Sequence, residues 1–551
     1  MRAIRTFILA AAVAATCIAG AYSQSKTGSW GDQGNGTYIN PVLNADYSDP
    51  DVCRVGDRYY MVCSEFHYMG MPVLESEDMV NWHIVSQIYS RLDFPGYDGM
   101  NSYANGSWAP SIRYHDGRLW VYFCTPTEGL FLSTAEKPEG PWSPLVEVKH
   151  VEKWEDPCPF WDDDGKAYLG HSLHGAGPVI IHRMSNDGTQ LLDDGLTVYT
   201  GPVAEGVKMF KKDGYYYISI PEGGVPVGWQ TVLRSKSIYG PYEKKVVLET
   251  GSTAVNGPHQ GALVDTPEGE WWFYHFQSAG ALGRVVHLQP VHWHDGWPVV
   301  GIDIDRNGIG EPVHVWKKPA AGSADIHAPR TDDDFDAPAP GLQWQFNHNP
   351  GPDAWSLSEK PGHLALKALR GESFLRAKNT LTQKVTGARG EVTVTLDVSR
   401  LADGQRAGLC SFGSLYGLIG VCRAEGRNYL FFETNRELFA RPRQPGVRID
   451  AFDTGANIVE KEPFRGKVVY LRLEMDYAAN RNRFYYSTDN RHFIPFGEEF
   501  GAMFSFWKGT RVGLFSYNEL RDGGTALFDR FRYEYDGPKH RNLKFNDSKT
   551  Q

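Results

Sequence analysis

One strand pattern recurs five times along the chain and limits what it can fold into. Each copy has an acidic or small residue beside Pro or Gly, an apolar stretch, a turn with Asp, Glu or Gly, and an aromatic-rich strand. The copies cover residues 48–65, 108–125, 155–172, 204–221 and 258–276. The Gly-Asp, Asp-Gly and Glu-Gly pairs at the turns predict a β-hairpin in each copy.

A second unit follows several of these hairpins. Residues 74–83, 132–143 and 233–243 each combine a strand, a polar turn and an aromatic residue before another apolar strand. The two units together give four strands in a repeat of about 50 residues, which is typical of a propeller blade. We therefore expect a five-bladed β-propeller over residues 38–316. An eight-stranded barrel is disfavoured because it would not repeat in fours.

The rest of the chain predicts a second all-β domain. A length of 551 residues exceeds what one core holds. Residues 317–331 are rich in Pro, Ala and Asp and are expected to be a linker. Beyond them apolar residues alternate with period two, as in 392–398 and 469–477. This alternation predicts an antiparallel β-sandwich over residues 332–538.

The first 23 residues have the features of a signal peptide. Arg2 and Arg5 precede an apolar run from Phe7 to Gly20, and Ala21-Tyr22-Ser23 places small residues before a cleavage point. The run is short for a membrane anchor, and no later apolar run approaches 18 residues. We expect an exported protein, periplasmic or extracellular, without a membrane span.

Charge and cysteine content narrow the function classes. The net charge of −10 disfavours a nucleic-acid partner, which needs a basic face, and a neutral partner fits better. Six cysteines remain after Cys17, spread too thinly for a disulfide scaffold and without zinc spacing. The pairs Cys53/Cys63 and Cys410/Cys422 could form disulfides, and free buried thiols are equally open.

Acidic residues open three of the five repeats. Asp49, Asp156 and Glu205 stand at this position in the first, third and fourth copies, where the second copy has Ala109-Pro110 and the fifth has His259-Gln260. Innermost strands of a propeller meet at its axis, so the three carboxylates are predicted to share one pocket. Repulsion and lost solvation should raise at least one pKa there.

A protonated acid beside an ionised one is what cleavage of a glycosidic bond requires. The alternative is that each carboxylate only accepts hydrogen bonds from turn amides. Glu65, Glu222 and Asp51 are weaker candidates, and Glu222 precedes a Gly-Gly loop that could approach the pocket.

Four ordered motifs resemble those of glycoside hydrolase family 43. They are Asn40–Cys53 (NPVLNADYSDPDVC), Glu155-Asp156-Pro157, Ala204-Glu205-Gly206 and Leu282-Gly283-Arg284. The resemblance implies that Asp49 is the general base, Asp156 the residue that modulates the pKa of the acid, and Glu205 the general acid of an inverting mechanism. It also implies that Arg284 binds the sugar and that the second domain is a concanavalin-like sandwich.

Other residues follow from the resemblance or from the pocket it implies. The family often holds a calcium ion in the channel through a His, here His259, and uses no organic cofactor. Phe66 and Trp108 are nominated to pack against sugar faces, with blade core as the equal alternative. Phe506-Trp507 is expected to pack in the sandwich core rather than to close the pocket. Asp51 adds a carboxylate close to Asp49 where the family's motif commonly has Ser.

The implied substrates are arabinose- and xylose-containing plant polymers. We expect an enzyme that removes terminal units from an oligosaccharide or polysaccharide, an α-L-arabinofuranosidase or a β-xylosidase, with a slight preference for the first. An endo-arabinanase fits if the channel mouth is an open groove. A non-catalytic carbohydrate-binding propeller would not need all three carboxylates, and a protein-interaction propeller would need none.

Overall fold

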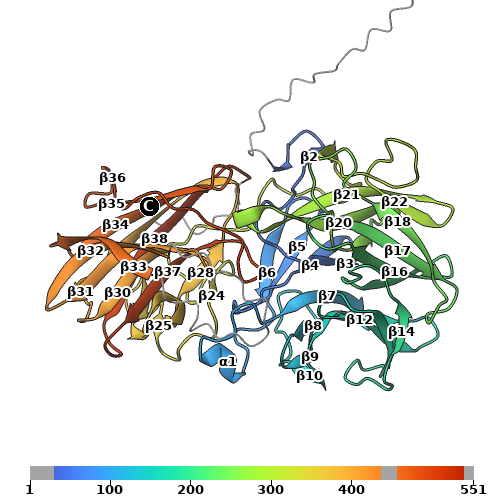
Figure 1. Cartoon of the computed structure of the whole chain (residues 1–551), viewed down its shortest axis with the longest axis horizontal. Helices are drawn as coiled ribbons and strands as arrows, with labels where there is room; N and C mark the ends of the chain where they lie inside the picture. Colours follow the sequence, from blue (N-terminus) through green and yellow to red (C-terminus); the bar gives the residue numbers. More distant parts are fainter. Residues whose placement is uncertain (1–29, 436–455, 539–551) are drawn as a thin grey trace, which may run out of the picture.

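The structure is a computed structural model that describes residues 30–435 and 456–538. Two β domains lie side by side, the propeller in blue to green and the sandwich in yellow to red (Figure 1). Within the described ranges one short α-helix occurs, α1 (Pro95–Asp98). The predicted signal peptide, residues 1–23, lies outside these ranges. No helix among the described residues is long and apolar enough to cross a membrane.

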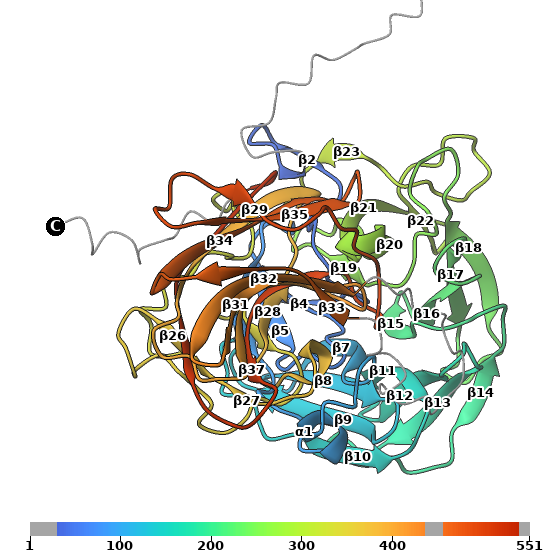
Figure 2. The ribbon, with the colours of Figure 1, turned by 60° about the vertical axis from the view of Figure 1, so that its left-hand side comes forward.

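Five four-stranded antiparallel sheets form the first domain, as predicted, and they follow one another around a ring in sequence order (Figure 2). The strands of blades 1 to 3 are β3 (Asp51–Val55), β4 (Arg58–Val62), β5 (Pro72–Ser76), β6 (His83–Gln87), β7 (Trp108–His115), β8 (Arg118–Thr125), β9 (Gly129–Ala135), β10 (Val146–His150), β11 (Trp154–Trp161), β12 (Ala167–Leu173), β13 (Val179–Met184) and β14 (Leu196–Tyr199). Those of blades 4 and 5 are β15 (Lys208–Lys212), β16 (Tyr215–Glu222), β17 (Trp229–Ser235), β18 (Glu243–Leu248), β19 (Leu263–Asp265), β20 (Trp271–Ser278), β21 (Arg284–His294) and β22 (Trp297–Val300).

The Asp-Gly turns explain why these hairpins form. Asp116-Gly117 joins β7 to β8 with φ of 48° and 73°, and Asp213-Gly214 joins β15 to β16 with 50° and 73°. Two successive residues with positive φ make the turn that matches the right-handed twist of paired strands. The predicted hairpins are therefore confirmed with their turn residues.

A small separate sheet joins the two ends of the propeller. It consists of β1 (Gly31–Asp32), β2 (Thr37–Ile39) and β23 (Val315–Lys317). The segment after β2 then runs along blade 5, where Leu43 and Val286 exchange backbone hydrogen bonds. The Asn40 amide donates to the Leu288 carbonyl and accepts from its N–H. The N-terminal segment and blade 5 are thus joined by hydrogen bonds, although they do not share a blade.

The second domain is a sandwich of two antiparallel sheets. One sheet contains β24 (Gln345–Phe346), β28 (Leu381–Lys384), β37 (Arg511–Asn518), β30 (Gln405–Phe412), β31 (Gly417–Ala424), β32 (Arg427–Asn435) and β33 (Ala456–Phe464), with β27 (Leu369–Arg370) parallel to β37. The other contains β25 (Trp355–Ser356), β26 (Leu364–Lys367), β38 (Thr525–Tyr535), β29 (Arg389–Asp397), β34 (Val468–Asp476), β35 (Arg481–Ser487) and β36 (Ile494–Pro495).

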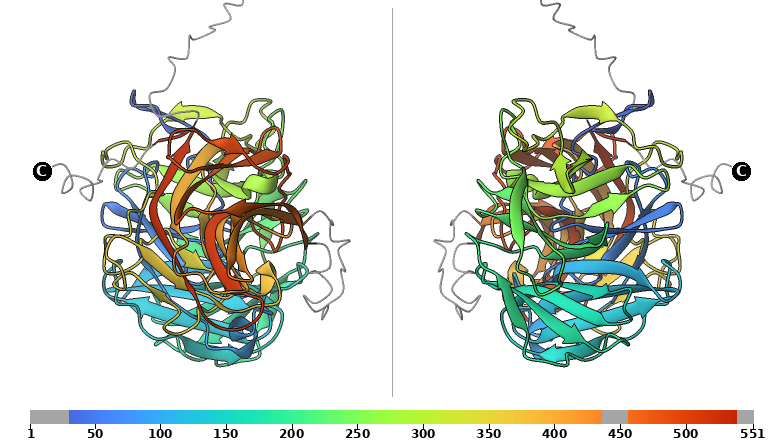
Figure 3. Two further views of the ribbon diagram at one scale, coloured as in Figure 1. Left: turned by 90° about the vertical axis from the view of Figure 1, so that its left-hand side faces the viewer. Right: turned by 90° about the vertical axis from the view of Figure 1, so that its right-hand side faces the viewer.

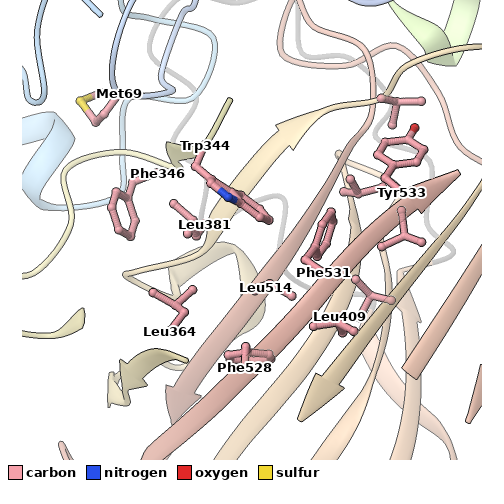
Figure 4. Close-up of a cluster of buried hydrophobic side chains, with 14 of the residues drawn as sticks. Met69, Trp344, Phe346, Leu364, Leu381, Leu409, Leu514, Phe528, Phe531 and Tyr533 are labelled. Carbon is pink, nitrogen blue, oxygen red and sulfur yellow. The ribbon is translucent and has the colours of Figure 1, made fainter. Parts of the chain in front are cut away.

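Alternating apolar residues of both sheets fill the space between them. Val392, Val394 and Leu396 are fully buried, as the period-two pattern predicts. Figure 4 shows Leu409 and Leu514 of one sheet facing Phe528 and Phe531 of the other. All six cysteines of the described residues are free and buried, so neither pair forms a disulfide in the structure.

Residues between the domains lie against the propeller. Lys318 pairs with Asp32 and Asp78, and the backbone N–H of His327 donates to Asn81. The bridge between Asp333 and Phe531 then starts the sandwich. Figure 3 shows the sandwich in front of the propeller on the left and behind it on the right.

A buried charge cluster holds the sandwich on the propeller. Propeller residues Asp46 and Glu65 face Lys384, Lys508 and Arg511 of the sandwich, and all five are buried. Glu65 Oε1 lies 2.5 Å from Lys384 Nζ, and Glu65 Oε2 lies 2.7 Å from Arg511 Nη2. Lys508 Nζ lies 3.1 Å from Asp46 Oδ2.

The cluster carries three cations and two anions, and the imbalance shows in its pKa values. Burial, with the charges of Lys508 and Arg511, lowers the pKa of Lys384 to about 8 against the opposing effect of Glu65. Burial would raise the pKa of Asp46, but Lys508 and Lys384 lower it to about 2. Each carboxylate is therefore tied to its cations in the ionised form.

We expect Glu65→Gln to destabilise the protein strongly, because it leaves Lys384 and Arg511 buried without their counter-charge. Breaking a buried pair in this way costs about 3–5 kcal/mol. The free energy of unfolding in urea measures the loss. Glu136→Gln is the matched control, since its pair with Arg118 is exposed and such pairs contribute up to about 1 kcal/mol. Equal, small losses in the two variants would contradict the role given to the cluster.

Candidate active site

A pocket of about 700 Å³ opens where the inner ends of the five blades meet. All five blades and one loop of the sandwich line it. Its polar and aromatic lining residues are Asp49, Phe66, Trp108, Glu155, Asp156, His174, Glu205, Gln260, Arg284 and Trp507. The six residues that the sequence nominated for catalysis and sugar binding are all among them.

Strand register shows that the carboxylates occupy two neighbouring positions of the repeat rather than one. In β11, Glu155 pairs with Ser172, and the next paired residue comes three positions later. Trp108 has the same place in blade 2, since it pairs with Cys124 and the next paired residue again follows three positions later. Glu205 and His259 stand at this same register in blades 4 and 5. Glu205 is therefore equivalent to Glu155, and the prediction that it shares the position of Asp49 and Asp156 is wrong by one residue.

The second of these positions has a left-handed backbone in every blade. The residues and their φ values are Asp49 (54°), Ala109 (36°), Asp156 (59°), Gly206 (61°) and Gln260 (44°). In blade 4 only glycine fits, because a Cβ on Gly206 would lie 2.5 Å from Pro221 and 2.9 Å from Gln260. The carboxylate of that blade consequently comes from the preceding residue.

Asp49 is held by two side chains. Its Oδ1 accepts a hydrogen bond from Arg284 Nη1 at 2.8 Å, and its Oδ2 accepts one from the Ser64 hydroxyl at 2.6 Å. Both partners are buried, so the pair of Arg284 with Asp49 is not a surface salt bridge. The contacts come from side chains and not from turn amides, which leaves Asp49 as an oriented, ion-paired carboxylate in the pocket wall.

Asp156 is buried among three donors. Its Oδ2 accepts from the Ser172 hydroxyl at 2.6 Å and from the backbone N–H of Gly206 at 2.7 Å, and its Oδ1 accepts from Gln260 at 2.9 Å. Burial and the charge of Glu205 nevertheless raise its pKa to about 6. The predicted upward shift is present in the pocket.

Glu205 is the carboxylate that faces the open part of the pocket. Its side chain is 22% exposed, against 6% for that of Asp49. Its Oε1 lies 2.8 Å from Nε2 of His259, which is fully buried. A single imidazole therefore fixes the orientation of Glu205.

The structure does not confirm the calcium ion expected at His259. Calcium takes six to eight oxygen ligands. The ranges that the structure describes contain no group of three His, Cys, Asp or Glu side chains that could hold a metal. Since the Nε2 atom of His259 is occupied by Glu205, its role in the structure is that of a hydrogen-bond partner.

Glu155 is a pocket residue that the sequence reasoning did not nominate. Burial, Asp156 and Glu205, in that order, raise its pKa to about 9. The Glu-Asp pair before Pro157 was visible in the sequence, but only the register of β11 shows that both side chains reach the pocket.

Aromatic rings form one side of the pocket. The ring of Trp108 lies 6.0 Å from that of Phe66, 4.9 Å from that of His174 and 6.5 Å from that of Trp507, in edge or tilted contacts. Phe66 and Trp108 line the pocket as nominated. Trp507 is 42% exposed at the pocket, so the expectation that it packs in the sandwich core is wrong.

The weaker candidates lie outside this pocket. Glu65 belongs to the charge cluster between the domains. Glu222 accepts hydrogen bonds from Tyr199 and Thr231. Asp51 pairs with Arg113 beside a second cavity of about 410 Å³.

Comparisons with known proteins agree with this geometry. The model of glycosyl hydrolases family 43 matches residues 38–298, and the model of the beta xylosidase C-terminal concanavalin A-like domain matches residues 332–534. A putative beta-xylosidase of Xylanibacter ruminicola is 53% identical, over 89% of this chain and 88% of that protein. The non-reducing end alpha-L-arabinofuranosidase BoGH43B of Bacteroides ovatus is 34% identical, over 60% of this chain and 65% of that protein.

A solved structure extends the likeness to both domains. The xylan beta-1,4-xylosidase of Bacillus halodurans superposes with a TM-score of 0.77 at 26% identity, over 90% of this chain and 99% of that one. Such enzymes need no organic cofactor. The chain is a glycosidase and belongs to glycoside hydrolase family 43.

Proposed function

We propose that the protein is an exported enzyme that removes terminal xylosyl or arabinofuranosyl units from plant cell-wall polysaccharide with inversion at the anomeric carbon. The observation that supports it best is the division of labour among the pocket carboxylates. Asp49 is ion-paired with Arg284, Glu205 faces the open side on His259, and Asp156 lies buried beside Gln260.

Asp49 is assigned the role of general base. Its two oxygens are fixed by Arg284 and Ser64, so one lone pair can be presented to a water molecule on one face of the sugar ring. As the base takes the proton, the water oxygen attacks the anomeric carbon. Arg284 keeps the carboxylate of Asp49 in place while Asp49 takes up the proton and negative charge develops on the leaving oxygen.

Glu205 is assigned the role of general acid. It donates its proton to the glycosidic oxygen as the bond to the anomeric carbon breaks. Beside Glu205, burial and neighbouring carboxyl groups raise the pKa of Glu155 to about 9 and that of Asp156 to about 6, so a proton stays available next to Glu205. Asp156 tunes this supply because its own pKa is raised to about 6.

The substrate is proposed from the pocket and from the relatives. Trp507, contributed by the sandwich, stands at the pocket beside Trp108 and limits its length, which favours chain ends over the open groove of an endo-arabinanase. Xylose is the first candidate for the terminal sugar, because the relative from Xylanibacter ruminicola is named a putative beta-xylosidase. The Bacteroides ovatus relative keeps arabinofuranose as the second candidate, although the sequence alone slightly favoured it.

Asp49→Asn and Glu205→Gln should each lower kcat on para-nitrophenyl β-xyloside or α-L-arabinofuranoside by about 10²–10⁴-fold, the usual contribution of acid–base groups. Glu222→Gln is the control, a buried carboxylate of blade 4 outside the pocket. Circular dichroism and melting temperature confirm folding. Failure of the wild type to cleave either glycoside, arabinan or xylan would refute hydrolysis. Full activity in either variant would refute the assigned roles.

Proton NMR during hydrolysis of a β-linked xylo-oligosaccharide tests both inversion and action at chain ends. We expect α-xylose to appear first and to mutarotate later. Xylose should be the only sugar released from the chain end. Initial release of β-xylose would indicate a double displacement. A mixture of longer products would indicate attack inside the chain.

Export is proposed from the basic start and apolar run of residues 1–23. Expression in a bacterial host followed by sequencing of the exported protein should give an N-terminus at Gln24. An intracellular product that retains Met1 would contradict export.

A further inference from the structure

Glu155 occupies a place in the pocket that the reaction outlined above does not use. It lies one blade before Glu205 at the equivalent register and directly precedes Asp156. The residue is only 8% exposed and still lines the pocket. Its Oε1 atom is buried without a hydrogen-bond partner in the described part of the chain. A buried polar atom of this kind is costly unless a ligand or water completes it.

The surroundings of Glu155 oppose a negative charge on it. Three carboxyl groups oppose a charge on it, Asp156, Glu205 and Asp49, while a hydrogen bond from the backbone N–H of Ala176 favours the ionised form. Two other titratable side chains near it are neutral. Burial lowers the pKa of His174, and burial with Asp156 and Glu155 raises that of the Cys124 thiol.

Arg284, which lines the pocket, is engaged by Asp49. The pKa of Glu155 is accordingly raised to about 9, so at neutral pH the side chain is a carboxylic acid. A neutral acid differs in chemistry from an ion-paired carboxylate such as Asp49, because it has an O–H to donate where a carboxylate can only accept.

We propose that Glu155 is a substrate-binding residue that donates a hydrogen bond from its neutral carboxyl group to a hydroxyl oxygen of the terminal sugar. The inference rests on the proposed function and deepens it. Sugar hydroxyls both donate and accept, and a carboxylate such as Asp49, which is paired with Arg284, serves only their hydrogens. Glu155 supplies the complementary donor and satisfies its own unpartnered oxygen when the sugar enters.

Two substitutions of similar size separate the hydrogen bond from the charge. Glu155→Gln keeps a neutral donor, and Glu155→Met fills the space without one. Binding is measured by calorimetry with xylotriose and with an arabino-oligosaccharide, in a Glu205→Gln background that slows hydrolysis by about 10²–10⁴-fold. At pH 6.5 we expect affinity within about threefold for Gln and a loss of about tenfold for Met, the magnitude of one net hydrogen bond.

Each contrary result is decisive. Wild-type affinity in the Met variant would show that Glu155 does not contact the sugar. Equal losses in Gln and Met would show that the anion is required. If neither oligosaccharide binds the background protein and the wild type hydrolyses neither, the proposed function has failed, and not the role of Glu155 alone.

The pH dependence gives a readout that a purely structural residue would not move. Affinity in the Glu155 protein should fall as the pH rises toward 9.5, as the donor is lost, and should stay level in Glu155→Gln. The free energy of unfolding should also fall as the pH rises. Because the folded pKa is raised above the unfolded value, the stabilisation present below about pH 4.5 is lost as the pH rises through about 9. A pH-independent affinity in the parent would overturn the proposal, even if the Met variant failed to fold.

Discussion

The ion cluster buried between the two domains is the interaction on which the pocket depends. Lys508 reaches from the sandwich to Asp46, and its Nζ also donates to the Ser64 carbonyl at 3.0 Å. The Ser64 hydroxyl holds Asp49, and Asp46 accepts from the backbone N–H of Arg284. The positions of Asp49 and Arg284 are therefore set by charges of the sandwich, a domain whose described residues contribute no carboxylate to the pocket.

The same cluster brings the sandwich loop to the substrate. Trp507 precedes Lys508, so anchoring the lysine places the indole beside Trp108. Arg511 adds a second anchor on Glu65 and stacks over Tyr68, with its guanidinium carbon 3.5 Å from the ring centroid. A buried ion network of this kind adds little net stability, but its directional contacts specify one docking geometry. That geometry places Trp507 in the lining of the pocket.

Much of this fold could be read from the sequence because its signals are local. Asp-Gly turns and aromatic strands repeat in blades whose hairpins close within a few residues, and period-two alternation at Val392–Leu396 marks a half-buried sheet. Convergence of Asp49, Asp156 and Glu205 follows from the symmetry of the ring. Family resemblance added the roles.

What could not be read depends on backbone angles and on contacts across the chain. By residue type, the repeat aligns Glu205 with Asp156. In the structure the residue with left-handed backbone is Gly206, which is therefore equivalent to Asp156, and Glu205 is equivalent to Glu155. Trp507 resembled a core residue because its partner Trp108 is some 400 positions away. The contact between His259 Nε2 and Glu205 joins two blades, so no single repeat of the sequence indicates it.

The left-handed residues at the inner ends of the blades also affect how this enzyme can change. Non-glycine residues in that conformation store about 1–3 kcal/mol of strain each, and Asp49, Ala109, Asp156 and Gln260 all have it. Glycine would relax the backbone at these places, but at Asp49, Asp156 and Gln260 it would also remove the polar side chain of the pocket. At the axis, a substitution that raises stability would therefore lower activity. Stabilising substitutions that keep activity should lie at the periphery of the blades.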